Sequence, residues 1–173
     1  AAKAGVTSIE HCTMVDDEGI EYMLKNNVAA VPTLIVLHVL ADGLSKGVAQ
    51  SAVDKAAYLL PKHADNIRNA YERGVRCVFG TDTGTPLGPH GYQHKEFVYM
   101  AEAGISPEDI LLAATRYAAE LLKWEDQIGT IQPGKFADII AVKGNPLEDI
   151  SSLNRDTISF IMKDGIVYKN EQN

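Results

Sequence analysis

Two residues suited to metal chemistry follow apolar segments of this chain. His11 comes directly after residues 7–10, and Asp82 closes Gly80-Thr81-Asp82 after residues 75–79. One neutral imidazole and one carboxylate are ligands that suit a divalent ion such as zinc. Two ligands do not complete a site, so plainer interpretations stay open. His11 could be a hydrogen-bonded structural residue, and Asp82 could form an ordinary Asx-type turn.

The other histidines are weaker candidates for chemistry. His90 and His94 lie in or just after the Gly/Pro-rich loop 80–89, so they could reach a substrate, although solvated positions explain them equally well. His38 closes an apolar segment and could touch substrate, with core packing as the alternative. His63 is expected on the surface of a helix.

The remaining reactive side chains favour structural roles. Arg116 could bind a carboxylate, but a surface ion pair is the interpretation we prefer. Cys12 and Cys77 lack a C-x-x-C pattern and are expected to be small buried residues in a reducing compartment, with the cytoplasm as the expected location. Phosphate-binding glycine motifs and the G-x-S-x-G motif are absent from the sequence, which disfavours phosphate cradling and serine hydrolysis.

Strands and helices alternate in the pattern that must position these residues. Residues 7–10, 28–37 and 75–79 are predicted strands, and Pro32 must lie near an end or an irregularity of the second one. Such alternation predicts an α/β fold. Four helices are expected: one after Asp16-Asp17, one from Ser51 to Gly74, one that ends at Gly104 and one from Ser106 to Leu121. The second would begin with a capping box of Ser51 and Asp54, and Pro61 would break or kink it.

The pattern changes after Trp124. Residues 137–142 and 159–168 are predicted strands, and Asp164-Gly165 is a type I′ turn signal. We therefore expect two parts, an α/β part over residues 1–124 and a small antiparallel part over residues 125–173.

Charge and hydropathy limit the classes of partner. Sixteen Lys and Arg against 23 Asp and Glu give a net charge of −7, which disfavours nucleic acid. The longest apolar run, residues 28–37, is well short of the roughly 20 residues that a membrane span needs. We expect neither nucleic acid nor a membrane as a partner.

Several segments, in their order along the chain, resemble the amidohydrolase superfamily. They are Gly5-Val6-Thr7-Ser8-Ile9-Glu10-His11, Val31-Pro32-Thr33-Leu34, Phe79-Gly80-Thr81-Asp82, Gly129 to Ile139, Gly144-Asn145-Pro146-Leu147 and Met162-Lys163-Asp164-Gly165. The likeness covers essentially the whole chain and is closest to the prolidase-like branch near imidazolonepropionase. These enzymes are metal-dependent, and the branch includes dipeptidases.

The resemblance implies a fold and a ligand set. The fold would be the C-terminal part of a (β/α)8 TIM barrel, with the three predicted strands as strands six to eight, followed by part of a small composite β-sandwich. His11 would be the sixth-strand metal ligand, and Asp82 would bind metal and shuttle a proton. The implied cofactor is one or two divalent ions, with zinc expected. The other ligands would precede Ala1.

The function implied is metal-dependent hydrolysis of a C–N amide bond in a small molecule, with a dipeptide as the expected substrate. A cyclic amide, as for imidazolonepropionase, and a non-catalytic module for assembly or binding are the alternatives. Three parallel strands are few for such a sheet, and the first five residues resemble the last turn of a helix. We therefore expect the C-terminal portion of a longer enzyme, inactive alone, that forms homo-oligomers or associates with its N-terminal part.

Overall fold

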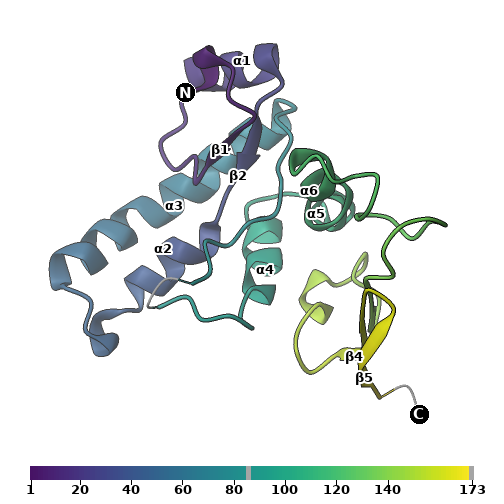
Figure 1. The fold of residues 1–173 in the computed structure, drawn as a ribbon. Coiled ribbons are helices and arrows are strands. Elements are labelled where there is room, and N and C mark those ends of the chain that lie inside the picture. Colours follow the sequence, from purple (N-terminus) through teal and green to yellow (C-terminus); the bar gives the residue numbers. More distant parts are fainter. Residues whose placement is uncertain (85–86, 172–173) are drawn as a thin grey trace.

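A computed structural model describes residues 1–84 and 87–171 of the 173-residue chain, so Thr85 and Pro86 of the expected loop lie outside the described residues. Figure 1 shows a short pair of strands beside a long helix, further helices near the ends of those strands, and an antiparallel sheet built from the last part of the chain. The short strands and the helices around them carry the candidate site.

The parallel sheet has the expected direction. Strand β1 (Ser8–Glu10) pairs in parallel with β2 (Ala29–Val31). Residues 75–79, predicted as a strand, are not one: they lie along the other side of β2 and form an isolated parallel bridge there, between Cys77 and Ala30. The Ala30 N–H donates to the Arg76 carbonyl at 2.9 Å, and the Val78 N–H donates to the Ala30 carbonyl at 2.8 Å. The carboxyl ends of all three segments therefore share one edge, and the predicted α/β class is confirmed.

The apolar run 28–37 is not one strand, and that prediction is wrong. β2 ends at Val31, and helix α2 (Leu34–Ala41) begins three residues later. Pro32 has no N–H for a sheet, and Thr33 adopts a left-handed conformation with φ 51°. A continuously apolar run has no period that separates a buried strand from a buried helix, so the sequence pattern alone could not divide it.

The first helix follows its sequence signals. Helix α1 (Asp17–Asn26) begins after Asp16, whose carboxylate accepts a hydrogen bond from the Gly19 N–H at 2.8 Å. Asn27 ends the helix in a left-handed conformation, φ 53°. A short polar side chain tolerates that conformation better than most, so the expected stop is confirmed.

Helix α3 (Gln50–Glu72) corrects two expectations. It begins after Ala49, which has no capping side chain, and Asp54 accepts a hydrogen bond from Gln50 Nε2 at 2.7 Å instead of forming a capping box with Ser51. Pro61 lies inside one continuous helix, so the expected break is wrong, whereas a kink at Pro61 stays a prediction. The helix packs along α2, and that contact stabilises it despite the one backbone donor that proline lacks.

Shorter elements complete the α/β part. Helix α5 (Pro107–Ala114) begins directly after the expected Ser106, whose hydroxyl accepts a hydrogen bond from the Asp109 N–H at 3.1 Å. The expected continuous helix to Leu121 is instead divided at Thr115, which has non-helical φ and ψ. These elements are η1 (Ala2–Ala4), η2 (Leu44–Lys46), α4 (His94–Glu102), α5 (Pro107–Ala114) and α6 (Arg116–Leu121).

The last part of the chain forms the predicted antiparallel sheet. Its strands, in spatial order, are β3 (Ile139–Val142), β4 (Ile158–Lys163) and β5 (Ile166–Asn170). Asp164 and Gly165 have φ of 51° and 76°, as a type I′ turn requires. The short helix η3 (Ile150–Ser152) packs on α4, so Ile150 and Leu153 belong to the same buried cluster as Met100.

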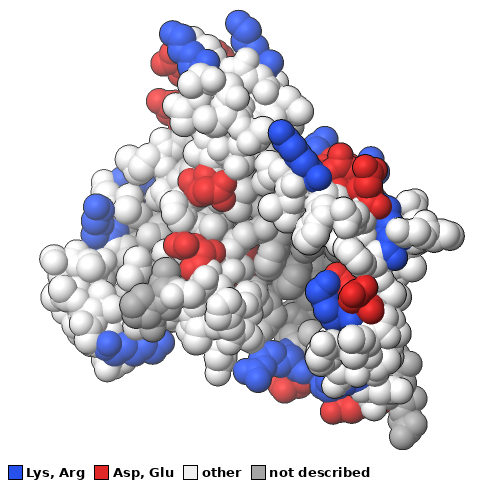
Figure 2. All heavy atoms as spheres, in the orientation of Figure 1, with Lys and Arg blue, Asp and Glu red and all other residues white. Residues whose placement is uncertain are grey.

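The surface mixes charges of both signs. Figure 2 shows Lys and Arg side chains scattered among Asp and Glu over the face drawn, without a continuous basic patch. Within residues 1–84 and 87–171, every helix is too short or too polar to cross a membrane.

The main core joins the α/β helices to the sheet. Ile20, Ile67, Met100 and Ile110 are completely buried in it. We predict that Ile110→Ala in the full-length protein lowers the free energy of unfolding by about 2–5 kcal/mol, because the site loses apolar contact and retains a cavity. Chemical denaturation measures this. Ile131→Ala is the matched control, since Ile131 is 80% exposed. Equal effects of the two substitutions would contradict the assigned core.

Candidate functional site

His11 stands at the carboxyl end of β1 and is held by several hydrogen bonds. Its N–H donates to the Val31 carbonyl at 2.8 Å, and its own carbonyl accepts from His63 Nε2 at 2.6 Å. Its ring Nδ1 lies 2.5 Å from the Thr33 hydroxyl oxygen. The side chain is exposed, so an anchored imidazole faces outward from the strand end.

The Thr33 hydroxyl determines which His11 nitrogen carries the proton. That hydroxyl donates its one hydrogen to the Pro32 carbonyl at 2.7 Å, so towards His11 it can only accept. With that hydrogen directed to Pro32, a hydrogen bond between His11 and Thr33 has Nδ1 as its donor. In the neutral ring the Nε2 lone pair is then free, which is the arrangement that metal-binding histidines require.

Left-handed backbone is concentrated at the same edge of the sheet. His11, Cys12, Thr33 and Asp82 have φ of 67°, 52°, 51° and 50°. Each such residue costs of order 1–3 kcal/mol unless its surroundings enforce it, and these residues cluster at functional sites. Two of these strained residues, His11 and Asp82, are the predicted metal ligands. The hydrogen bonds of the His11 N–H and carbonyl groups hold that residue in its left-handed conformation.

Asp82 follows the third parallel segment, and Gly80 brings that segment close to β2. A Cβ atom on Gly80 would lie 2.3 Å from Val31 Cγ1, so any larger residue would displace the segment. Asp82 is exposed. The segment that precedes Asp82 therefore packs closely on β2 at Gly80, while the Asp82 side chain stays accessible.

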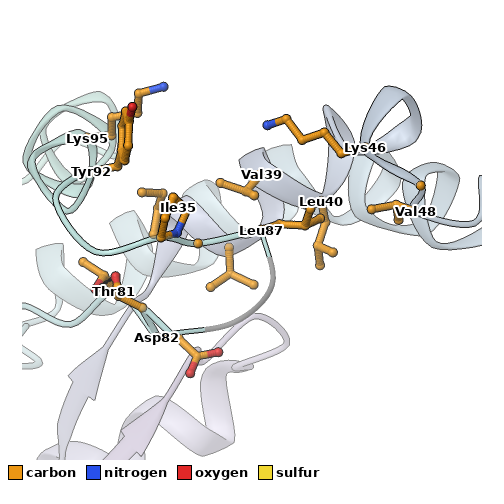
Figure 3. Close-up of a pocket in the computed structure, with 15 residues that line it drawn as sticks. Ile35, Val39, Leu40, Lys46, Val48, Thr81, Asp82, Leu87, Tyr92 and Lys95 are labelled. Carbon is orange, nitrogen blue, oxygen red and sulfur yellow. Dashed lines mark hydrogen bonds between the residues drawn. The ribbon is translucent and has the colours of Figure 1, made fainter.

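A pocket of about 710 Å³ opens beside Asp82. Figure 3 shows Asp82 at the end nearest the strands, with apolar side chains of α2 and Leu87 further along. His11 lines a different hollow, of about 450 Å³, together with Glu10, Thr13 and Met14. Among the described residues, no three His, Cys, Asp or Glu side chains form a group that could hold a metal ion. The two predicted ligands thus share a sheet edge but not a pocket.

The two weaker substrate candidates lie elsewhere. His38 is on helix α2, not at a strand end as expected, because the apolar run turns into a helix before it. Its ring stacks on Tyr99 with centroids 3.6 Å apart, and burial lowers its pKa. His90 is exposed and does not line the pocket beside Asp82. A role for either in substrate binding stays a prediction.

The prediction that His63 is on the surface is wrong, whereas the expectations for the other structural side chains are confirmed. His63 is 1% exposed, because its face of α3 turns toward His11. Arg116 forms a surface ion pair with Glu120 at 2.8 Å. Cys12 and Cys77 are free and buried, and burial raises their pKa values to about 11 and about 12.

Glu96 is the residue of this region that sequence reasoning missed. It is completely buried, and its two carboxylate oxygens accept hydrogen bonds from the Leu34 and Ile35 N–H groups at 2.8 and 2.7 Å. It therefore caps α2 from 62 residues away. Burial raises its pKa to about 7, although these two hydrogen bonds lower it. The available signal was its spacing: Glu96, Met100 and Ala103 share one buried helical face.

Known proteins match the chain over nearly its whole length. Residues 1–167 match the model of the Amidohydrolase family. Ochratoxinase from Aspergillus niger is 30% identical over 172 residues, 98% of this chain and 35% of that protein. Imidazolonepropionase from Caldanaerobacter subterraneus subsp. tengcongensis is 32% identical over 146 residues, 83% of this chain and 30% of that protein.

Solved structures match the fold as well. A Xaa-Pro dipeptidase with methionine bound in its active site has 42% identity and a TM-score of 0.88, covering 98% of this chain and 41% of that one. A prolidase complexed with N-methylphosphonate-L-proline has 30% identity and a TM-score of 0.86, covering 98% and 42%. This chain thus spans less than half the length of each of these relatives.

The Glu96 cap gives a pH-dependent prediction. Because the folded-state pKa of about 7 exceeds the usual 4.5, the folded state binds the proton more tightly than the unfolded state does. The Glu96 contribution to the free energy of unfolding should therefore fall as pH rises from about 4.5 to about 7. Glu96→Gln abolishes this pH dependence, and at pH near 5 it should destabilise the protein by about 1–3 kcal/mol, because the amide nitrogen of Gln cannot accept a hydrogen bond from the second N–H group.

Denaturation of the full-length protein across this pH range measures the difference between wild type and Glu96→Gln. Glu102→Gln, at an exposed position of the same helix, is the matched control. A wild-type-minus-variant difference that stays constant with pH would contradict the assignment.

Proposed function

The chain belongs to the amidohydrolase family, and from that membership we propose that it contributes His11 and Asp82 to a metal-dependent hydrolase that cleaves a C–N amide bond. The observation that carries the proposal is the contact between His11 Nδ1 and the Thr33 hydroxyl, which favours one tautomer of His11. Its Nδ1 donates to Thr33, which leaves Nε2 available as a ligand at the exposed end of β1. Relatives named as a Xaa-Pro dipeptidase and a prolidase support the reaction class.

The donor set fits a divalent metal ion, with zinc expected and one or two ions per site. His11 would supply a neutral imidazole, and Asp82 would supply an accessible carboxylate. These are fewer than the three protein ligands of an ordinary catalytic zinc site, so further ligands must come from outside the described residues. When bound, the metal supplies Lewis-acid polarisation of the carbonyl and lowers the pKa of a water.

Asp82 performs the proton transfer in this proposal. Its carboxylate accepts a proton from the attacking water and returns it to the nitrogen of the leaving amine, which could not depart easily as an anion. Thr33 keeps the His11 ring in one tautomer and orientation. Gly80 permits the close approach of the Asp82 segment to β2.

A small amide such as a dipeptide is the substrate that we propose. Similarity to imidazolonepropionase, 32% over 146 residues, favours a cyclic amide as the second candidate. We further propose that residues 1–124 are the part of a (β/α)8 barrel that contains its strands six to eight, and that residues 125–173 form part of a β-sandwich. We also propose that the protein acts in the cytoplasm. Homo-oligomers, or association with an N-terminal part, would complete the site.

The first test of this function is Asp82→Asn in the full-length protein. We expect kcat to fall by about two to four orders of magnitude, because an amide cannot accept and return the proton. Turnover of a dipeptide library, with metal content measured on the same preparations, checks this. Asp54→Asn, on the exposed side of α3, is the control and should retain activity. Near-normal turnover in Asp82→Asn would refute the assigned proton transfer.

The second test concerns the metal. We expect His11→Ala to lose most of the affinity of one metal site, and Thr33→Val to lower that affinity about 10- to 100-fold, because the ring loses the acceptor that orients it. Competition with a chromogenic chelator measures both. His90→Ala serves as the control. Unchanged stoichiometry and affinity in His11→Ala would show that His11 is not a ligand.

A further inference from the structure

Two lysines stand at the mouth of the pocket beside Asp82. Lys46 comes from η2 and Lys95 from α4, and both line the pocket. Figure 3 shows their side chains extending from opposite sides of its mouth. Neither ammonium group forms an ion pair or hydrogen bond with a described residue. Among the described lining residues, Asp82 is the one carboxylate.

The side chains that line the space between the lysines and Asp82 are mostly apolar. Helix α2 supplies Ile35, Val39 and Leu40, and the loop before α4 supplies Leu87. Ile35 is 6% exposed, so this wall continues into the core rather than forming a solvated surface. A ligand that fills the pocket must therefore carry an apolar segment.

Together these features specify a ligand with three parts. We propose that, beyond the dipeptides of the proposed function, this pocket binds an amide whose free carboxylate is separated from the scissile bond by an apolar chain, with the carboxylate between Lys46 and Lys95 and the amide at Asp82. Two like charges without a counterion attract an anion, and the chain between them and Asp82 buries its apolar surface. The amide end rests on the proposed function, whereas the anionic end is testable without hydrolysis.

Binding is tested on the metal-free full-length protein with the fluorescent probe dansylaminoundecanoic acid and with its uncharged primary amide. We expect saturable binding of the acid, roughly tenfold tighter than that of the amide and weakened by salt. Lys46→Ala and Lys95→Ala should each weaken binding of the acid roughly three- to fivefold and leave binding of the amide unchanged. Lys55→Ala, at an exposed position on α3 outside the pocket, is the matched control.

Equal affinity for the two probes, or affinity for the acid that both lysine substitutions leave unchanged, would overturn the proposal. Val39→Asp adds a further check, since a carboxylate in the apolar wall should abolish binding of both probes. Circular dichroism shows whether each variant is folded. If a variant is misfolded, salt dependence and the comparison of acid with amide in the wild-type protein decide the question.

Hydrolysis forms a separate arm of the test. The mono-para-nitroanilide of suberic acid should be cleaved with a higher kcat/KM than that of succinic acid, because only the longer chain spans the pocket. Lys46→Ala and Lys95→Ala should remove this preference, and a preference for the shorter substrate would overturn the proposal. If neither anilide nor any dipeptide is cleaved, the proposed function fails, while the probe measurements still decide whether the lysines bind the carboxylate.

Discussion

Glu96 accepts hydrogen bonds from the first two N–H groups of α2 inside the core, and the geometry of the strand ends depends on that interaction. Thr33 cannot cap the helix, because its hydroxyl is engaged with the Pro32 carbonyl and with His11. The carboxylate from α4 satisfies these helix donors instead. One buried acid thus stabilises the change from β2 to α2 and frees Thr33 to hold His11.

The same interaction connects the candidate ligand to the pocket. Helix α2 begins beside Thr33, which orients His11, and it continues as the apolar wall opposite Asp82. The core under α4 therefore supports both the left-handed backbone at the strand ends and the surface that would receive substrate. Residues keep a strained backbone conformation where the surrounding structure enforces it. Here hydrogen bonds from β2, α3 and α4 enforce the left-handed conformations at the strand ends.

Much of the local structure, and the placement of His11 and Asp82 at one edge of the parallel sheet, could be predicted from the sequence. Asp16 and Ser106 cap helices through their own side chains, and Asp164-Gly165 forms its turn, because each signal acts between residues close in the chain. His11 and Asp82 were singled out because each follows a short apolar segment, and the parallel pairing places both segments with their carboxyl ends at one edge. The motifs also identified the family that the comparisons then showed.

Contacts between distant residues decided the rest. The apolar run 28–37 has no periodicity that shows where a helix begins, and the first N–H group of that helix is satisfied by Glu96, 62 residues beyond Leu34. Because His38 lies on that helix, its ring stacks on Tyr99. The packing of α3 buries His63, whose Nε2 contacts the His11 carbonyl oxygen. The tautomer of His11 and the opposed lysines of the pocket likewise arise from residues brought together by folding. Composition and spacing report local preferences, whereas burial, long-range hydrogen bonds and pocket shape exist only once the chain is packed.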